Sequence, residues 1–132
     1  MSCKSAIYAV NTASTAISEG GTYSPTTVVR RFGQCCQLGS NAITLNGCGY
    51  YDVAASVTLT GSAAGTVTMT VYQNGTAVTG MNATQSVGAS GDIVTLGVSG
   101  IVRNYCGTST LTIVISGQAV TGTNLTVDVT KQ

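Results

Sequence analysis

Few residues in this chain could do chemistry. Its 132 residues include five cysteines and four carboxylates but no histidine, which excludes a Ser–His–Asp triad, a Cys–His dyad and a histidine metal site. The four carboxylates are Glu19, Asp52, Asp92 and Asp128. A glycosidase needs two carboxylates about 5–10 Å apart in a cleft, whereas these four are spread over predicted strands and loops. We therefore predict that the protein is not an enzyme, and we expect no cofactor and no metal.

The cysteines leave three alternatives open. They are Cys3, Cys35, Cys36, Cys48 and Cys106. An odd number cannot be fully paired within one chain, adjacent cysteines pair poorly with each other, and the C-x-x-C spacing typical of a zinc site is missing. The five are candidates for free thiols or for disulfides within or between chains, and metal binding is the weakest alternative. The segments 33–39, 47–49 and 105–107 are expected to meet at one end of the fold.

The second notable property of the chain is its low charge. Only 7% of its residues are charged and the net charge is +1, against about 25% charged residues in an ordinary soluble domain. Without a basic excess we expect neither nucleic acid nor a membrane surface as a partner. The N-terminus shows no apolar stretch followed by a cleavage site, so we expect synthesis in the cytoplasm without a signal peptide.

Arg30 and Arg31 form the only run of charge in the sequence. Adjacent guanidinium groups could bind a carboxylate surface on a partner. They could equally guard an edge strand against unwanted sheet pairing. The sequence leaves both interpretations open.

The elements that must position these residues are strands. From residue 43 onward, apolar side chains alternate with Thr and Ser, as in a strand with one buried face. The apolar set is clearest in Tyr51–Leu59, Val67–Val71, Val94–Val98, Leu111–Ile115 and Leu125–Val129. No stretch has the spacing of an amphipathic helix, so we predict an all-β sandwich or barrel of seven or eight strands with essentially no helix.

Turn residues separate the predicted strands. Asn74-Gly75 is the strongest hairpin signal, because both residues tolerate positive φ. Breaks are also expected at 88–91 and 117–122, and a loop at 33–40. Residues 6–10 and 28–32 are predicted strands in the less regular region 1–42. No linker interrupts residues 1–132, so we expect a single domain.

One segment resembles a known family. Residues 43–53 read ITLNGCGYYDV, an apolar strand, a glycine turn and then an alternating strand, and a later strand ends in Tyr72-Gln73-Asn74-Gly75. This order resembles the C1q/TNF-like jelly roll, including the versions in bacterial spore-surface proteins and phage virions. The resemblance covers residues 43–132 and, more loosely, 1–42. The overall sequence is similar to small structural proteins of phages of gut Firmicutes.

The resemblance implies a jelly-roll β-sandwich that assembles as a homotrimer. Apolar or aromatic side chains on the second face of a strand would then lie between protomers, where tyrosine is favoured. The candidates for this interface are Tyr50, Tyr72, Ile93 and Val114. The alternative is that Tyr50 and Tyr72 are ordinary exposed strand tyrosines.

The implied function is structural. We expect a virion surface protein, as a capsid decoration or head-fibre protein of a phage, whose partners are its own copies and a capsid protein. Arg30 and Arg31 are the candidates for docking to that capsid. Two alternatives stay open: a receptor-binding or adhesin module of the same fold, with the segment 78–91 as a contact loop, and a non-viral spore or cell-surface trimer.

Overall fold

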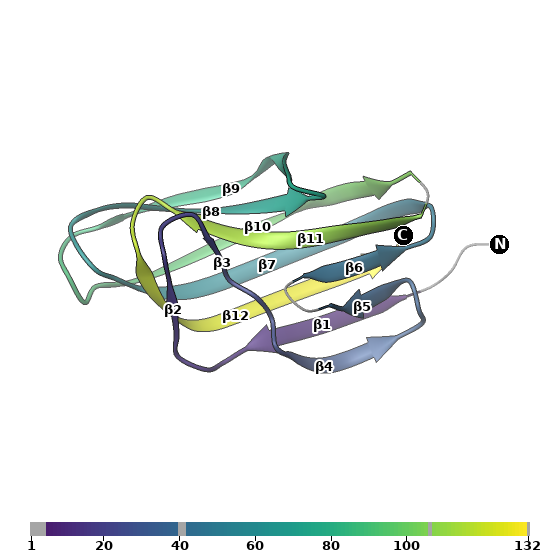
Figure 1. Ribbon diagram of the computed structural model, residues 1–132, viewed down its shortest axis with the longest axis horizontal. Coiled ribbons are helices and arrows are strands. Elements are labelled where there is room, and N and C mark those ends of the chain that lie inside the picture. The colour runs from purple at the N-terminus through teal and green to yellow at the C-terminus, as the bar shows by residue number, and fades with distance from the viewer. Residues whose placement is uncertain (1–4, 40–41, 106, 132) are drawn as a thin grey trace.

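The computed structural model describes residues 5–39, 42–105 and 107–131. These residues form strands, turns and loops but no helix, which confirms the all-β prediction. Two antiparallel sheets, A and B, stack face to face as a sandwich (Figure 1). No helix capable of crossing a membrane occurs in the described part of the chain.

Sheet A is built around the long strand that follows the Gly-Tyr motif. It contains, in spatial order, β10 (Ile93–Asn104), β7 (Gly49–Gly61), β12 (Val120–Lys131), β1 (Ala6–Asn11) and β4 (Thr27–Phe32), with the short β2 (Thr15–Ile17) also beside β12. The strands β10 and β4 form its two edges, so the pair Arg30 and Arg31 lies on an edge strand.

Sheet B covers the inner side of sheet A. Its spatial order is β5 (Cys36–Leu38), β6 (Ile43–Asn46), β11 (Thr108–Ser116), β8 (Gly65–Gln73) and β9 (Thr76–Val87), with β3 (Gly21–Thr22) also beside β11. From β6 onward the chain passes repeatedly between the two sheets, and only the β8–β9 hairpin stays within one. The long strands β7, β8, β10, β11 and β12 therefore each bury one face in a shared core, whereas every residue of the edge strand β4 is exposed.

The core lies between the sheets and has the side chains that the alternation predicts. These side chains are almost completely inaccessible to solvent: Tyr51, Val53, Val57, Leu59, Val67, Met69, Val71, Leu111, Ile113, Ile115, Leu125, Val127 and Val129. Each fully buried aliphatic side chain contributes about 1.5–3 kcal/mol relative to an exposed one. The period-two pattern therefore identifies the buried face correctly.

Several predicted loops are partly strand. The expected loop at 33–40 contains β5, because Cys36 is buried and pairs with Leu45 of β6. The expected contact loop at 78–91 is wrong as well, since β9 runs to Val87 and only a short turn follows. The expected break at 117–122 is shorter in the structure, because β11 ends at Ser116 and β12 begins at Val120.

The Asn74-Gly75 turn is confirmed by its backbone. Asn74 has a φ of 53° and Gly75 a φ of 82°, both in the left-handed region that a tight two-residue hairpin requires. Asn74 is the only residue other than glycine with a positive φ in the described ranges. Its amide side chain holds β11, accepting from the Thr110 N–H at 3.0 Å.

Two tyrosines are fully buried in the core, but their hydroxyl groups differ. The Tyr51 hydroxyl lies 2.6 Å from the Asn46 carbonyl oxygen and 2.9 Å from that of Gly47. The Tyr23 hydroxyl has no hydrogen-bond partner in the described part of the chain, and its ring packs where a Cβ on Gly122 would overlap it. The Tyr51 hydroxyl thus has hydrogen-bond partners, whereas the buried Tyr23 hydroxyl has none among the described residues and destabilises the fold.

This difference predicts opposite effects of the same substitution. Tyr23→Phe is expected to leave the stability unchanged or to raise it, because it removes an unsatisfied buried hydroxyl. Tyr51→Phe is expected to cost about 1 kcal/mol, because the Asn46 carbonyl oxygen loses this donor, while the Gly47 oxygen still accepts from the Asn104 amide. Denaturant unfolding of both variants beside the wild type measures the two changes. Equal destabilisation by both would contradict the contacts described.

Candidate functional site

The outer face of sheet A carries several exposed apolar side chains. Alternate residues of β7 and β10 point outward there, including Tyr50 and Ile101, and Tyr8 and Phe32 add to it from β1 and β4. Ile93 and Ile101 are 70% and 63% exposed, although isoleucine is among the residue types most often buried. Exposed apolar side chains gathered on one face are typical of an interaction surface.

The middle of the β7–β10 pair, on one side of this face, carries only short side chains. Ser99 of β10 pairs with Ala54 of β7, and Gly97 pairs with Ser56 in the next outward row. Since no long side chain stands between these strands at this point, another surface can approach the sheet closely. The larger apolar groups lie at the ends and along the β4 side of this flat strip.

The charged groups of the face do not neutralise each other. Asp128, Tyr8 and Arg30 form one row across β12, β1 and β4, with the tyrosine between the two charges. Asp52 lies diagonally from Asp128 on the neighbouring strand. No ion pair within 4.0 Å joins any two of the charged residues that the structure describes.

Arg103 stacks on aromatic rings. Its guanidinium carbon lies 4.4 Å from the centroid of the Tyr105 ring and 5.5 Å from that of Tyr50. A lone arginine in a chain of low charge favours an ion pair, with Asp52 or Asp92 as candidates, but Arg103 forms one with neither. Asp92 instead accepts a hydrogen bond from the Ala89 N–H at 3.1 Å and stabilises the β9–β10 turn.

The four predicted interface residues do not form one patch. Tyr50 and Ile93 lie on the outer face of sheet A, at opposite ends of the β7–β10 pair. Tyr72 and Val114 lie on sheet B, where both are half-buried. Only the first pair thus belongs to the exposed face described above.

The predicted docking pair also divides between two sides of the sheet. Arg30 pairs with Tyr8, whose side chain faces outward, whereas Arg31 pairs with the buried Ile7. Both are exposed, and both line a pocket of about 210 Å³ with Tyr8, Phe32 and Asp128 among its other residues. Their position on β4 is compatible with docking and with protection of the sheet edge.

The cysteines gather at the end of the sandwich where β7 begins and β10 ends. Cys35 and Cys48 each take part in a disulfide, whereas Cys36, also a disulfide candidate from the sequence, is a free and buried thiol. The Gly47 N–H donates to the Gly107 carbonyl at 3.3 Å, which joins two of the three cysteine-bearing segments, and the Asn46 N–H donates to the Cys35 carbonyl of the third at 2.8 Å. Cys3 and Cys106 lie outside the described residues.

Ser5 connects the cysteine-bearing loop to sheet A by hydrogen bonds. Its hydroxyl donates to the Phe32 carbonyl at 2.9 Å and accepts from the N–H groups of Cys35 and Cys36 at 3.1 and 3.2 Å. The serine is itself buried, so these bonds are shielded from water. The loop that bears the cysteines is thereby attached to β1 and β4.

Three buried acidic groups at or near the core make the stability sensitive to high pH. Burial raises the pKa of the Cys36 thiol above its ordinary value of 9.0, although the Ser5 hydrogen bond and the Lys131 charge oppose this. Burial also raises the pKa values of Tyr23 and Tyr51 above 10.0. The folded state therefore keeps these protons at a pH where the unfolded chain loses them.

The expected result is a stability that is constant up to about pH 9 and falls as the pH rises further, because a raised pKa of an acid favours the unfolded state once that state ionises. Cys36→Val should delay the onset by about one pH unit, to the range where tyrosine titrates. Thermal unfolding midpoints between pH 7 and pH 11 test this. A midpoint that rises above pH 9 would contradict it.

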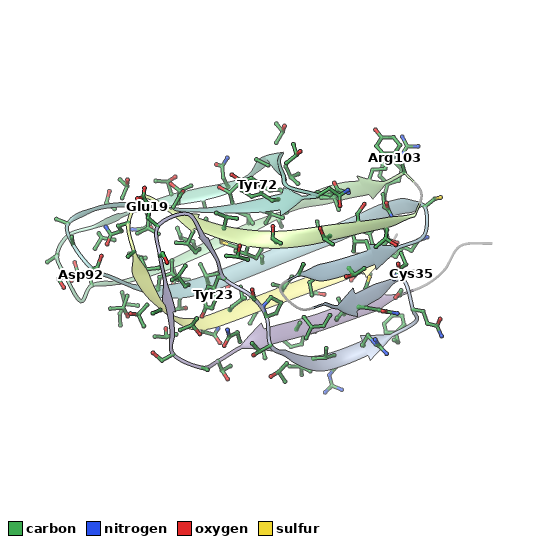
Figure 2. All side chains as sticks on the ribbon, viewed as in Figure 1. Glu19, Tyr23, Cys35, Tyr72, Asp92 and Arg103 are labelled. Carbon is green, nitrogen blue, oxygen red and sulfur yellow. The ribbon has the colours of Figure 1, made fainter. Side chains whose placement is uncertain are left out.

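A polar pocket lies beside the cysteines at the same end (Figure 2, near Arg103). Its volume is about 340 Å³, and three segments line it: the β8–β9 hairpin, the end of β10 and the start of β11. The residues are Gln73, Asn74, Thr76, Arg103, Asn104, Tyr105, Thr108 and Ser109. The sequence does not predict this pocket, although two of its parts, the Asn74-Gly75 turn and Tyr105 in the segment 105–107, carry separate signals.

Comparison with known proteins bears on the fold. No protein-family model matches the chain, and no curated protein matches it in sequence. The structure of murine APRIL at pH 8.5 superposes with a TM-score of 0.77 at 15% identity, over 98% of this chain and 99% of that chain. The structure of murine APRIL at pH 5.0 gives 0.73 at 18% identity, over 98% and 99%.

A third similar structure comes from an insect. Eiger TNF from S. frugiperda superposes with a TM-score of 0.70 at 10% identity, over 100% of this chain and 94% of that chain. The fold is a C1q/TNF-like jelly roll. This confirms the fold that the sequence predicted, from the Gly-Tyr strand through the Asn-Gly turn. Because one fold hosts many activities, the function of this jelly roll is argued from its own surfaces.

Proposed function

We propose that the protein is a structural component of a phage particle, present as a homotrimer on the virion surface. In this role it is a capsid decoration or head-fibre protein that acts by assembly and display and catalyses no reaction. The outer face of sheet A carries the proposal, because it combines exposed apolar side chains with a flat strip of short ones. Such a face is suited to close contact with another copy of the chain.

The unpaired charges of the face support a contact between copies. Burying Asp52 or Asp128 without a counter-ion would be costly. A neighbouring copy brings an arginine of its own, since Arg103 lies on β10 at the edge of the same sheet opposite to β4. A cyclic arrangement can therefore bring the guanidinium groups of one protomer to the carboxylates of the next, without any pairing inside the protomer.

The low charge of the chain has the same explanation. With 7% charged residues, the protein leaves Thr and Ser to keep its remaining strand faces hydrated. The resemblance of the strand and turn motifs in residues 43–132 to C1q/TNF-like jelly rolls, which include phage virion proteins, supports the virion as the place of this assembly, with synthesis in the host cytoplasm. Arg30 and Arg31 on the free edge of β4 are then the groups available to a capsid carboxylate surface.

Imaging of native particles tests the virion role. An antibody against the chain, coupled to gold, is expected to label phage heads in electron micrographs, and the chain should co-purify with particles through a density gradient. Labelling of cell envelopes or spores, with particles unlabelled, would contradict the proposal and favour a non-viral surface trimer. The neighbouring genes give an independent check, since capsid and portal genes are expected beside this one.

A receptor-binding module of the same fold is a second candidate, and the pocket beside Arg103 favours it. Its lining includes Tyr105, which is 73% exposed and is the kind of side chain that contacts ligands. The predicted contact segment 78–91 has no such feature and lies mostly within β9. If the chain binds a receptor, the end of the sandwich is the place for it.

A further inference from the structure

We propose that the pocket at the end of the sandwich binds a neutral pyranose unit of a surface glycan. This deepens the second candidate function and is independent of the assembly, because the eight described residues that line the pocket all come from one chain. A monomer would therefore retain the site. The following features carry the proposal: a rigid polar floor, an exposed tyrosine ring and polar atoms without partners.

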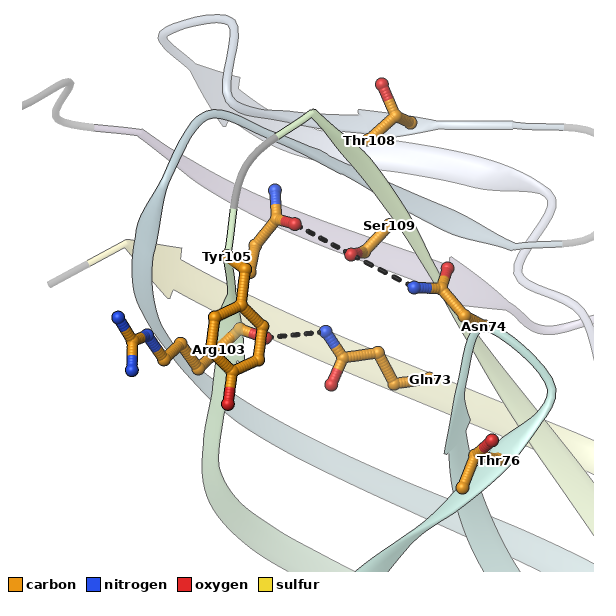
Figure 3. A pocket seen from close by; sticks show the side chains of 8 residues that line it. Gln73, Asn74, Thr76, Arg103, Tyr105, Thr108 and Ser109 are labelled. Atoms are coloured by element: carbon orange, nitrogen blue, oxygen red, sulfur yellow. Dashed lines mark hydrogen bonds between the residues drawn. The ribbon is translucent and has the colours of Figure 1, made fainter.

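The floor of the pocket is fixed by hydrogen bonds to the backbone. Asn104 is buried and its amide nitrogen donates to the carbonyl oxygens of Gly47 and Gly107, both at 3.0 Å. Ser109 donates to the Asn104 Oδ1 at 2.8 Å, and the Asn74 amide nitrogen donates to the Ser109 hydroxyl at 3.3 Å. The chain Asn74–Ser109–Asn104 is drawn as dashed lines in Figure 3.

A floor held in this way loses little freedom when a ligand binds. Immobilising a side chain on binding costs about 0.5–1.5 kcal/mol, and residues that are already fixed avoid this cost. Gln73 is held similarly, since its amide nitrogen donates to the Arg103 carbonyl at 2.8 Å. The pocket is therefore formed before any ligand arrives.

Tyr105 forms one side of the pocket. One face of its ring is in contact with the Arg103 guanidinium, whose carbon is 4.4 Å from the ring centroid. In the view of Figure 3, the ring is seen between that guanidinium and the Gln73 side chain. The arginine thereby supports an exposed aromatic surface, against which the apolar C–H groups of a pyranose ring can pack.

Polar atoms around this ring lack partners. Within the described residues, neither the Gln73 Oε1 nor the Thr76 hydroxyl makes a hydrogen bond, although both side chains line the pocket. The Thr108 hydroxyl donates to Asn46 Oδ1 at 3.1 Å and retains acceptor capacity. An acceptor amide oxygen and two hydroxyls match the vicinal hydroxyl groups of a sugar.

The electrostatics of the lining favour a neutral ligand. Six of the eight lining residues are uncharged Asn, Gln, Ser or Thr, and none is acidic, so the pocket has no carboxylate to hold a cation. The single charge, Arg103, is stacked between Tyr105 and Tyr50. A volume of about 340 Å³ is near the lower end of small-molecule sites, which fits one or two sugar rings.

Saturation-transfer NMR on the purified full chain tests the proposal. The probes are the methyl glycosides of glucose, galactose, mannose, rhamnose and N-acetylglucosamine, each added separately at millimolar concentration. At least one of them is expected to receive saturation on the ring protons of a single face. Tyr105→Ala should weaken its binding about tenfold or more, whereas Tyr105→Phe should retain it.

Tyr50→Ala is the matched control, because Tyr50 contacts the same guanidinium but does not line the pocket. Its binding should remain within about twofold of the wild type. Two results would overturn the proposal: no transfer to any of the five glycosides, or equal losses in Tyr105→Ala and Tyr50→Ala. Either result is distinct from a failure of the assembly proposal, because the assembly is tested by the molecular mass in solution and the pocket by saturation transfer.

Discussion

Val67→Asp and Ile113→Asp are each expected to abolish folding. Both side chains are buried between the sheets, Val67 on β8 and Ile113 on β11. An unpaired carboxylate at either site would cost several kcal/mol, against a total stability of about 5–15 kcal/mol for a domain of this size. Circular dichroism and proteolysis of the purified variants measure the outcome.

Thr66→Asp is the control for this experiment. Thr66 precedes Val67 on the same strand, but its side chain is exposed, so the charge remains in water. This variant should fold with a stability within about 0.5 kcal/mol of the wild type, as surface substitutions usually do. Wild-type stability in the Val67 and Ile113 variants would show that the buried faces of β8 and β11 are assigned wrongly.

Ala54→Arg is expected to convert the proposed trimer to monomers. Ala54 is exposed at the centre of the flat strip on sheet A, between Ser99 and Asp128 in the same row. A protomer on its own should tolerate the substitution, because the new guanidinium can remain hydrated beside Asp128. Between two closely packed copies, the same side chain would be both too long and desolvated.

Thr110→Arg adds the same side chain to the opposite sheet. Thr110 is also an exposed strand residue, but it lies on the outer face of sheet B. The mass of this variant in solution should remain that of the wild type, while Ala54→Arg elutes at the mass of one chain. If both variants dissociate, or if neither does, the outer face of sheet A is not the contact between copies.

The sequence predicts the sandwich well because burial on one face leaves a period-two pattern in each central strand. Tyr51 to Leu59 and Val67 to Val71 show this, with each apolar residue buried and each intervening residue at least partly exposed. The pattern is lost in β9, where only Met81 and Val87 are buried, so that an edge strand was interpreted as a loop. An edge strand such as β9 buries too few side chains to produce a period-two pattern in its sequence.

The functional surfaces are harder to predict from the alternation of residues in the sequence. Alternation shows that Tyr50 and Tyr72 are outward on their strands, but it does not show that these strands belong to different sheets. The pocket combines the β8–β9 hairpin with residues about thirty positions later, near Arg103. Only the pairing of β8 with β11, and the close approach of β10, brings these segments together.

The arrangement of the charges had to come from the structure too. A lone arginine in a chain of low charge predicts an ion pair, and the sequence offers Asp52 and Asp92 as partners for Arg103. The structure instead places Tyr50 and Tyr105 against the guanidinium. This matters for function, because it leaves the carboxylates on sheet A without partners inside the protomer.

The mass of the native chain in solution tests the central claim most directly. Size-exclusion chromatography with light scattering, at micromolar concentration and physiological salt, is expected to give about three times the chain mass of 13.2 kDa. The mass in solution should stay the same under reducing conditions, because the proposed contact is between sheet faces and requires no disulfide between chains. A single peak at the mass of one chain would contradict the assembly on which the proposed function rests.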